Sequence, residues 1–334
     1  MRRVILLLIV AVGLAPGTWW RSAPPPYDGG QELQIVPLDV KWQSIGRMQL
    51  VGAWELRSSS SHFHGYSALA ALDEGTLLAL SDRGRMLRFS APGRGGGPPR
   101  LGWFSVTTKG DEKRLADIEA MTRDSATGRL WAAYEGSNLI ERRDPDGGVR
   151  QVQPEAMRGW SDNSGPEAMV RLADGRFIVL SEGSARWNEN GSPGLLFPAD
   201  PVEGAEALRF QFVPPSGSRA VDMAQLPDGR VLILTRSIEW GLPPGFSSKL
   251  VLADPANILA GGEWAGTVVA EISEPLPTEN YEGLAIERGA DGETIVWLIS
   301  DDNASIFQRT LLLELRWRPN EKARGTSRAP LIRQ

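Results

Sequence analysis

The chain of 334 residues contains no cysteine. Disulfide bridges, thiolate metal sites, cysteine nucleophiles and a lipidated N-terminal cysteine are therefore excluded. Histidine is also scarce, because His62 and His64 are the only two in the sequence. A zinc site built on several histidines is not expected, and a Ser-His-Asp triad would have only this pair to supply its base.

Basic runs are missing as well. The sequence has 36 Lys and Arg against 41 Asp and Glu, a formal net charge of −5. Without a basic stripe, nucleic acid is not expected as a partner. The repeat region also lacks a convincing amphipathic helix of about 12 residues or more, which argues against helical repeats.

The N-terminus has the pattern of a secretory signal. Two arginines precede an apolar run from Val4 to Leu14, and small residues follow. Charged, apolar and small-residue regions in this order are typical of a signal peptide. Trp19 and Trp20 resemble interfacial anchors, so an uncleaved membrane anchor is the alternative. Either interpretation implies export to a bacterial periplasm or to the outside of the cell, with attachment to the inner membrane if the segment is retained.

The rest of the chain divides by composition. Residues 1–20 are predicted to be the signal peptide or N-terminal anchor, and residues 21–32, rich in proline and glycine, a linker. Residues 33–318 carry the repeated strand pattern of a single domain. Residues 319–334 form a polar C-terminal tail.

One hairpin pattern occurs five times. Each copy has a polar residue, an apolar strand, a glycine turn, a second apolar strand and another polar residue. The copies span residues 67–82, 119–135, 167–182, 222–236 and 282–301. Successive copies start 52, 48, 55 and 60 residues apart, which is the period of a four-stranded propeller blade. The sequence therefore predicts an all-β fold, a β-propeller of about five four-stranded blades.

The two ends of the domain each hold an incomplete element. Met48–Arg57 has the pattern of a strand but belongs to no hairpin, and the last blade has only three strands, ending with Thr310–Trp317. Pairing of these two segments would close the ring and remove an open sheet edge. Six blades are the alternative if residues 33–57 form more than one strand.

The polar residues that begin and end each hairpin lie at the same end of the blade, and most are acids. Because the first strand of a propeller blade lines the channel, the starting acids are expected to ring one channel mouth. These are Glu119, Glu167, Asp222 and Glu282. A second ring is expected just outside, made of Asp82, Glu135, Glu182 and Asp301. Arg83 and Arg236 fall at the same end.

Carboxylates this close raise one another's pKa unless something neutralises them. Ligands that are all oxygen suit Ca²⁺. The predicted Ca²⁺ ligands are Glu119, Glu135, Glu167, Glu182, Asp222, Glu282 and Asp301. The alternative is structural, since acids in a repeat also accept backbone N–H groups or join ion-pair networks.

Several short segments carry a resemblance to a known family. They are LALSDRGR, DIEAM, NSGPEAM, IVLSEG and NYEGLA, together with the final RTLLLEL. These segments resemble the phytase-like family known by its "esterase-like activity of phytase", and RTLLLEL resembles that family's usual ending. The resemblance covers roughly residues 45–317. It implies an exported bacterial β-propeller, and the family name implies hydrolysis of phosphate esters. The fourth blade departs from the pattern by placing Thr235 and Arg236 where an acid is expected.

Two functions from different classes fit these observations. The first is a Ca²⁺-dependent phosphoesterase acting on a small phosphate ester at the acidic mouth. Its candidate catalytic residues are Glu119, Glu167, Glu282 and Asp82, and its candidate substrate-binding residues are Arg83, Arg236 and His64. The second is a non-catalytic periplasmic propeller that uses the same mouth to bind a ligand or another protein.

Overall fold

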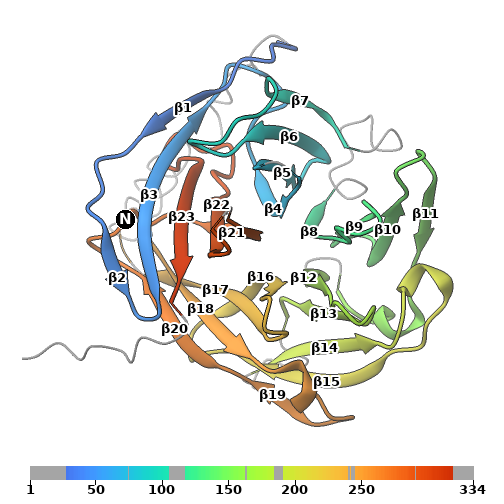
Figure 1. Cartoon of the computed structure of the whole chain (residues 1–334). Helices are drawn as coiled ribbons and strands as arrows, with labels where there is room; N and C mark the ends of the chain where they lie inside the picture. Colours follow the sequence, from blue (N-terminus) through green and yellow to red (C-terminus); the bar gives the residue numbers. More distant parts are fainter. Residues whose placement is uncertain are drawn as a thin grey trace, which may run out of the picture.

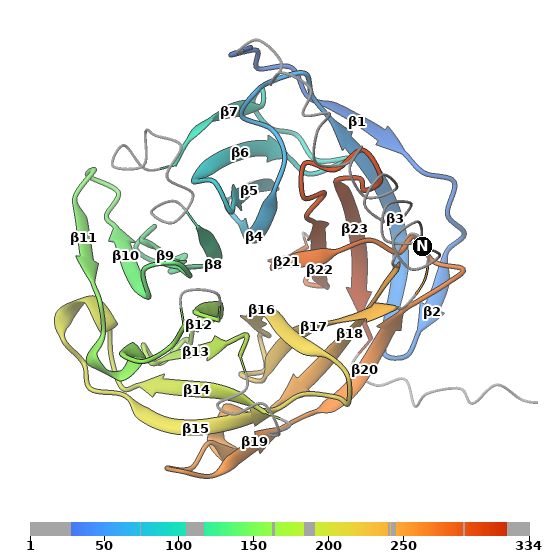
Figure 2. The ribbon, with the colours of Figure 1, turned by 180° about the vertical axis from the view of Figure 1, so that it is seen from behind.

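The computed structural model describes residues 28–73, 75–104, 117–161, 164–183, 191–239, 241, 245–289 and 291–318. Within these residues the chain forms five sheets arranged as a ring around a central channel (Figure 1), and Figure 2 shows the ring from behind. No helix of this described part is long and apolar enough to cross a membrane. The predicted signal or anchor (1–20) and the polar tail (319–334) lie outside the described residues.

Each of the first three blades is an antiparallel sheet whose strands follow one another from the channel outward. Blade 1 consists of β4 (Tyr66–Ala71), β5 (Thr76–Ser81), β6 (Arg85–Ser90) and β7 (Arg100–Trp103). Blade 2 consists of β8 (Ile118–Arg123), β9 (Leu130–Tyr134), β10 (Leu139–Arg143) and β11 (Val149–Val152). Blade 3 consists of β12 (Pro166–Arg171), β13 (Phe177–Ser181), β14 (Ser192–Phe197) and β15 (Leu208–Val213).

Blades 3 and 5 have additional strands at their edges. Blade 4 consists of β16 (Arg219–Gln225), β17 (Val231–Glu239), β18 (Gly245–Ala253) and β20 (Thr267–Ile272), while β19 (Glu263–Ala265) pairs in parallel with β15 of blade 3. Blade 5 consists of β21 (Tyr281–Arg288), β22 (Thr294–Ser300), β23 (Leu311–Trp317) and β3 (Met48–Arg57), with β1 (Gln34–Pro37) and β2 (Gln43–Ile45) outside. Three 3₁₀ turns lie in the described part, η1 (Glu155–Met157), η2 (Pro201–Glu203) and η3 (Pro255–Asn257).

The ring is closed by the N-terminal strand, as predicted. β3 pairs with β23 in antiparallel register from Leu311 opposite Glu55 to Trp317 opposite Met48. The five-blade prediction is confirmed, and the six-blade alternative is wrong. Residues 33–57 do form three strands, but all three join the sheet of blade 5.

The core lies between blades rather than inside one sheet. Five clusters of buried apolar side chains each combine residues of neighbouring blades. A strand such as β13 (FIVLS) is buried at all five positions because a blade packs against each of its faces. Each buried Leu, Ile, Val or Phe side chain contributes about 1.5–3 kcal/mol relative to exposure to water, so apolar runs without alternation suffice to specify these strands.

The innermost strand of every blade begins with a β-bulge. In each one, the register against the second strand shifts by one residue at the same position. The extra residues are Ser67, Glu119, Glu167, Val221 and Glu282. A bulge redirects the side chain of its extra residue, so these five positions are the structurally equivalent ones around the axis.

Asp222 is not one of them, and the expectation that it joins the acidic ring is corrected. It follows the bulge residue Val221, and a displacement of one residue turns a side chain to the opposite side of a strand. Its fully buried carboxylate accepts the backbone N–H of Leu284 at 2.6 Å, that of Met223 at 2.8 Å, and that of Leu69. Because these amides belong to blades 5, 4 and 1, Asp222 ties three blades together across the channel.

We predict that Asp222→Ala lowers the free energy of unfolding by at least about 3 kcal/mol. The substitution leaves buried amide donors without an acceptor, and each such group costs about 1–3 kcal/mol. Urea unfolding followed by tryptophan fluorescence measures the effect. Asp291→Ala, in an exposed hairpin turn, is the matched control and should change stability by less than about 0.5 kcal/mol. A loss below about 1 kcal/mol in Asp222→Ala would contradict the bridging role.

Candidate functional site

The structure brings the remaining predicted acids together at one mouth of the channel. Glu119, Glu167 and Glu282 are the bulge residues of β8, β12 and β21. Glu135, Glu182 and Asp301 directly follow the second strands of the same hairpins, and Asp82 follows the second strand of blade 1. Electrostatic repulsion reaches Glu119 from Glu167, Glu282 and Asp82, which come from three other blades. The two concentric rings expected from the repeat are therefore present, without Asp222.

Two groups of three carboxylates have the spacing of ligands around a cation. The first triad is Asp117, Glu119 and Glu135, and the second triad is Glu135, Glu167 and Glu182. Within each triad one carboxylate oxygen of every residue lies within 4.8 Å of the others. Glu135 belongs to both triads, so the two groups lie side by side across the boundary of blades 2 and 3.

Gly165 allows this close approach. A Cβ at position 165 would lie 2.6 Å from the backbone oxygen of Glu135 and 2.8 Å from its Cα, distances that side chains do not adopt. A glycine immediately before β12 therefore lets the start of blade 3 pack directly on Glu135.

Burial makes this concentration of acids costly. Desolvation raises the pKa of Glu119 well above its ordinary value, and repulsion from Glu167 and Glu282 raises it further. Desolvation likewise raises the pKa of Glu167, to which Glu182 and Glu135 add. The hydrogen bond between Glu167 and Glu135 raises the pKa of the first and lowers that of the second, although desolvation raises the pKa of Glu135 overall. These net shifts all favour the protonated forms of the three glutamates.

Arg236 neutralises the blade 4 side of the mouth, including Glu182 of the second triad, which Arg219 also approaches at 3.3 Å. Its side chain is only 17% exposed, donates to the carboxylates of Glu282 and Glu182, and also donates to the amide oxygen of Asn280. Burial lowers the pKa of Arg236, but the attraction of Glu282 and Glu182 outweighs it, so the net pKa is raised. Arg236 lies within β17, which continues to Glu239, at the position where the second strand of each other blade is followed by an acid. Its use as a substrate ligand stays a prediction.

The other two predicted substrate-binding residues lie at the rim. Arg83 is half exposed and approaches Asp82 at 3.9 Å. His64 is 44% exposed and pairs with Asp302, with 2.6 Å between Nδ1 and Oδ2. Both line a small hollow together with Asp82, so the rim of blade 1 places a cation and an imidazole beside the carboxylates.

A family model described as "Phytase-like: Esterase-like activity of phytase" matches residues 61–304. The chain belongs to the phytase-like family. The matched region spans the carboxylate triads, Arg236 and the His64–Asp302 pair. A search among proteins with curated descriptions finds no match.

Several solved structures resemble the chain at low sequence identity. A streptogramin B lyase is 12% identical with a TM-score of 0.40, covering 85% of this chain and 97% of that one. Inactive H270A virginiamycin B lyase from Staphylococcus aureus with quinupristin is 11% identical with a TM-score of 0.42, covering 85% and 99%. A nidogen/laminin complex is 11% identical with a TM-score of 0.40, covering 80% and 87%. At these TM-scores the similarities establish nothing further about this chain. The fold is assigned from the strand pairing and the family.

Three residues of this phytase-like mouth were missed by the sequence reasoning. Asp117 belongs to the first triad, Asn280 holds Arg236, and Asp302 orients His64. A signal for Asp117 was present, because it stands two residues before Glu119 in DIEAM, and alternate residues of a strand point to the same side. Asn280 stands at the same spacing before Glu282.

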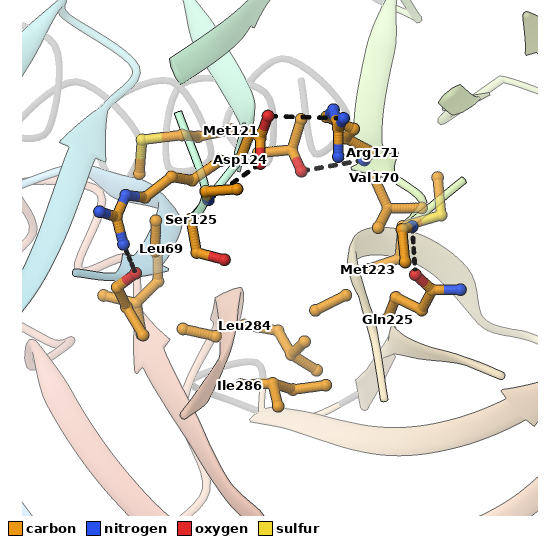
Figure 3. Close-up of a pocket in the computed structure, with 18 residues that line it drawn as sticks. Leu69, Met121, Asp124, Ser125, Val170, Arg171, Met223, Gln225, Leu284 and Ile286 are labelled. Atoms are coloured by element: carbon orange, nitrogen blue, oxygen red, sulfur yellow. Dashed lines mark hydrogen bonds and ion pairs between the residues drawn. The ribbon is translucent and has the colours of Figure 1, made fainter. Parts of the chain in front are cut away.

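The other end of the channel is different in character. A cavity of about 420 Å³ opens there, and Figure 3 shows apolar side chains such as Leu69, Met121 and Leu284 around it. The polar groups at its rim are paired among themselves, as in the contact of Asp124 with Arg171 at 3.4 Å. The converging carboxylates are therefore found at the other mouth.

We predict that the protein loses stability with rising pH when cations are removed. Burial, with Glu282 and Asp82 nearby, raises the pKa of Asp301 to about 8. Between its unfolded pKa near 4 and about 8, the folded state binds more protons than the unfolded state. Stability therefore falls as pH rises, by up to about 1.4 kcal/mol per pH unit for each such group. Urea unfolding with EDTA from pH 5.5 to 9 measures the slope, and Asp301→Asn should reduce it. A stability that is flat or rises over this range would contradict the prediction.

Proposed function

We propose that this phytase-like propeller is a Ca²⁺-dependent phosphoric ester hydrolase acting at the carboxylate mouth. The observation that carries the proposal is the sharing of Glu135 by two carboxylate triads. Two cation positions bridged by one carboxylate are the arrangement used to hold both the attacking and the leaving oxygen in phosphoryl transfer.

The donor set fits Ca²⁺. All ligands are carboxylate oxygens, and Ca²⁺ binds such oxygens at about 2.3–2.6 Å. Two oxygens on one ion are then at most about 5 Å apart, and the carboxylate oxygens of each triad lie within this distance of one another. A bound cation would also offset the repulsion that raises the pKa of Glu167. When bound, Ca²⁺ would neutralise the phosphoryl charge and make a coordinated water more acidic.

The remaining residues take roles that their positions allow. Glu119, Glu135, Glu167 and Glu182, with Asp117, hold the cations. Glu282 lies outside both triads, and burial raises its pKa, so it accepts the proton of the attacking water. Arg83, half exposed at the rim, binds phosphate oxygens through charge-assisted hydrogen bonds.

The second candidate is a binding propeller that does not catalyse. It is favoured by one observation, the engagement of Arg236 with Glu282 and Glu182, which leaves this arginine committed to carboxylates. In that case the cation-loaded mouth binds an anionic ligand or a partner protein without turnover. Both functions place the protein in the periplasm or outside the cell, because the N-terminal segment has the pattern of a signal or anchor.

We predict that Ca²⁺ raises the melting temperature of the wild type and that Glu135→Gln abolishes the rise. A ligand that binds only the folded state adds about 2.7 kcal/mol at a concentration one hundred times its dissociation constant. Glu135→Gln removes the carboxylate shared by both triads, whereas Glu119→Gln with Glu167→Gln removes one ligand from each. Glu155→Gln, whose carboxylate pairs with Arg158 on the surface, is the control and should keep the full response. An unchanged response in Glu135→Gln would overturn the cation site.

Catalysis is tested separately with p-nitrophenyl phosphate in Ca²⁺ and in EDTA. Hydrolysis that requires Ca²⁺ and is lost in Glu135→Gln supports the hydrolase. A Ca²⁺-dependent rise in melting temperature without hydrolysis of this or an alkyl phosphate supports the binding propeller instead.

A further inference from the structure

His64 and Asp302 form a fixed pair outside the carboxylate triads. Asp302 is almost fully buried, and its carboxylate also accepts from Thr310 Oγ1 at 2.8 Å and from the N–H groups of Ala304 and Gly65. Burial would raise the pKa of Asp302, but these hydrogen bonds and the contact with His64 lower it overall. A carboxylate held in this way orients the imidazole through Nδ1, and Nε2 is then the nitrogen that remains to exchange a proton.

The backbone at His64 is held in a conformation that non-glycine residues rarely adopt. Its φ is 90°, and that of the following Gly65 is 75°. Such strain persists where the surroundings impose it and is concentrated at functional sites. Here the surroundings are Asp302 on one side and Asp82 on the other, because a Cβ on Gly65 would lie 2.4 Å from Asp82 Oδ1.

The pair lies at the rim of the carboxylate mouth, on the side of blade 1. His64 lines a hollow whose other charged members are Asp82, Arg83 and Arg85. Asp82 in turn raises the pKa of both Glu119 and Asp301, so it lies between the hollow and the buried acids. The imidazole of His64 therefore lies on the blade 1 side of the carboxylate mouth, with Asp82 between it and Glu119.

We propose that His64, positioned by Asp302, is the general acid that protonates the leaving-group oxygen of the phosphate ester. This inference rests on the proposed hydrolase function. A water oxygen forms the new bond to phosphorus while the ester P–O bond breaks, and the leaving oxygen takes the proton from His64 Nε2. The proton lost by the water goes to a mouth carboxylate and returns through solvent to His64. One water is consumed, and an alcohol and inorganic phosphate are released.

The kinetic test compares two leaving groups in the His64→Asn variant. Asparagine tolerates the left-handed backbone region but cannot donate a proton as an acid. General acid catalysis contributes about 10²- to 10⁴-fold, and a poor leaving group needs it most. We expect kcat for an alkyl phosphate to fall by that factor, and kcat for p-nitrophenyl phosphate to fall less than about tenfold. Equal losses for both esters would assign His64 to binding or structure and overturn the inference.

A second test does not depend on turnover. Because the chain has only two histidines and His62 is 5% exposed, diethyl pyrocarbonate should modify one histidine in the wild type and none in His64→Asn. Long-range ¹H–¹⁵N NMR of the same two rings should show His64 protonated at Nδ1. A neutral His64 ring protonated only at Nε2 would overturn the proposed hydrogen bond to an ionised Asp302.

The failure of this inference is distinguishable from the failure of the proposed function. His64→Asn should keep the full Ca²⁺ response in melting temperature, since His64 belongs to neither triad. Ca²⁺-dependent hydrolysis that His64→Asn leaves unchanged for both esters would overturn only the general acid. A wild type that hydrolyses neither ester would overturn the hydrolase and the general acid together.

Discussion

The pairing of β3 with β23 is the constraint on which the site depends. Blades 1 and 5 are far apart in the sequence, and only ring closure makes them neighbours. The contact between His64 and Asp302 spans 238 residues, and Asp222 of blade 4 reaches amides of blades 5 and 1 only in a closed ring. Closure also removes the open edges that would otherwise expose unpaired backbone groups. The N-terminal strand therefore supports the mouth although it contributes no residue to it.

Closure creates an electrostatic problem at the same time. Equivalent positions around an axis must converge, and the bulges direct three glutamates into a space with little water. Desolvation is the largest cause of the raised pKa of Glu119, Glu167 and Glu282. Arg236 offsets part of this cost by contacting Glu282 and Glu182. In blades 2 and 3 the raised pKa values of Glu119 and Glu167 favour their protonated forms.

Much of this arrangement was predictable from residues, and the remainder depends on register. The hairpin period and the unpaired Met48–Arg57 segment led to five blades and to ring closure, since both follow from apolar patterning. Asp222 was misplaced because the repeats were aligned by acid type, whereas the structure aligns them by the bulge, which places Val221 there. A one-residue offset does not change the composition of the repeat, but it turns the side chain to the opposite side of the strand. Asp302 was missed because its partner is 238 residues away and no local pattern marks it.

The five blades do not carry the same residue at the bulge position, and these differences make the mouth asymmetric. If every bulge carried a glutamate, five like charges would surround the axis symmetrically. Such a mouth would bind a substrate in no preferred orientation. Instead, blade 1 has Ser67, whose hydroxyl donates to the backbone oxygen of Ile118 in blade 2, and blade 4 has Val221. Arg236 contacts Glu282 of blade 5 and Glu182 of blade 3. The two triads joined by Glu135 lie at the boundary of blades 2 and 3. Blade 1 presents His64 at one border of that region and blade 4 presents Arg236 at the other. A ligand bound there meets different chemistry on its two sides, which a symmetric ring cannot provide.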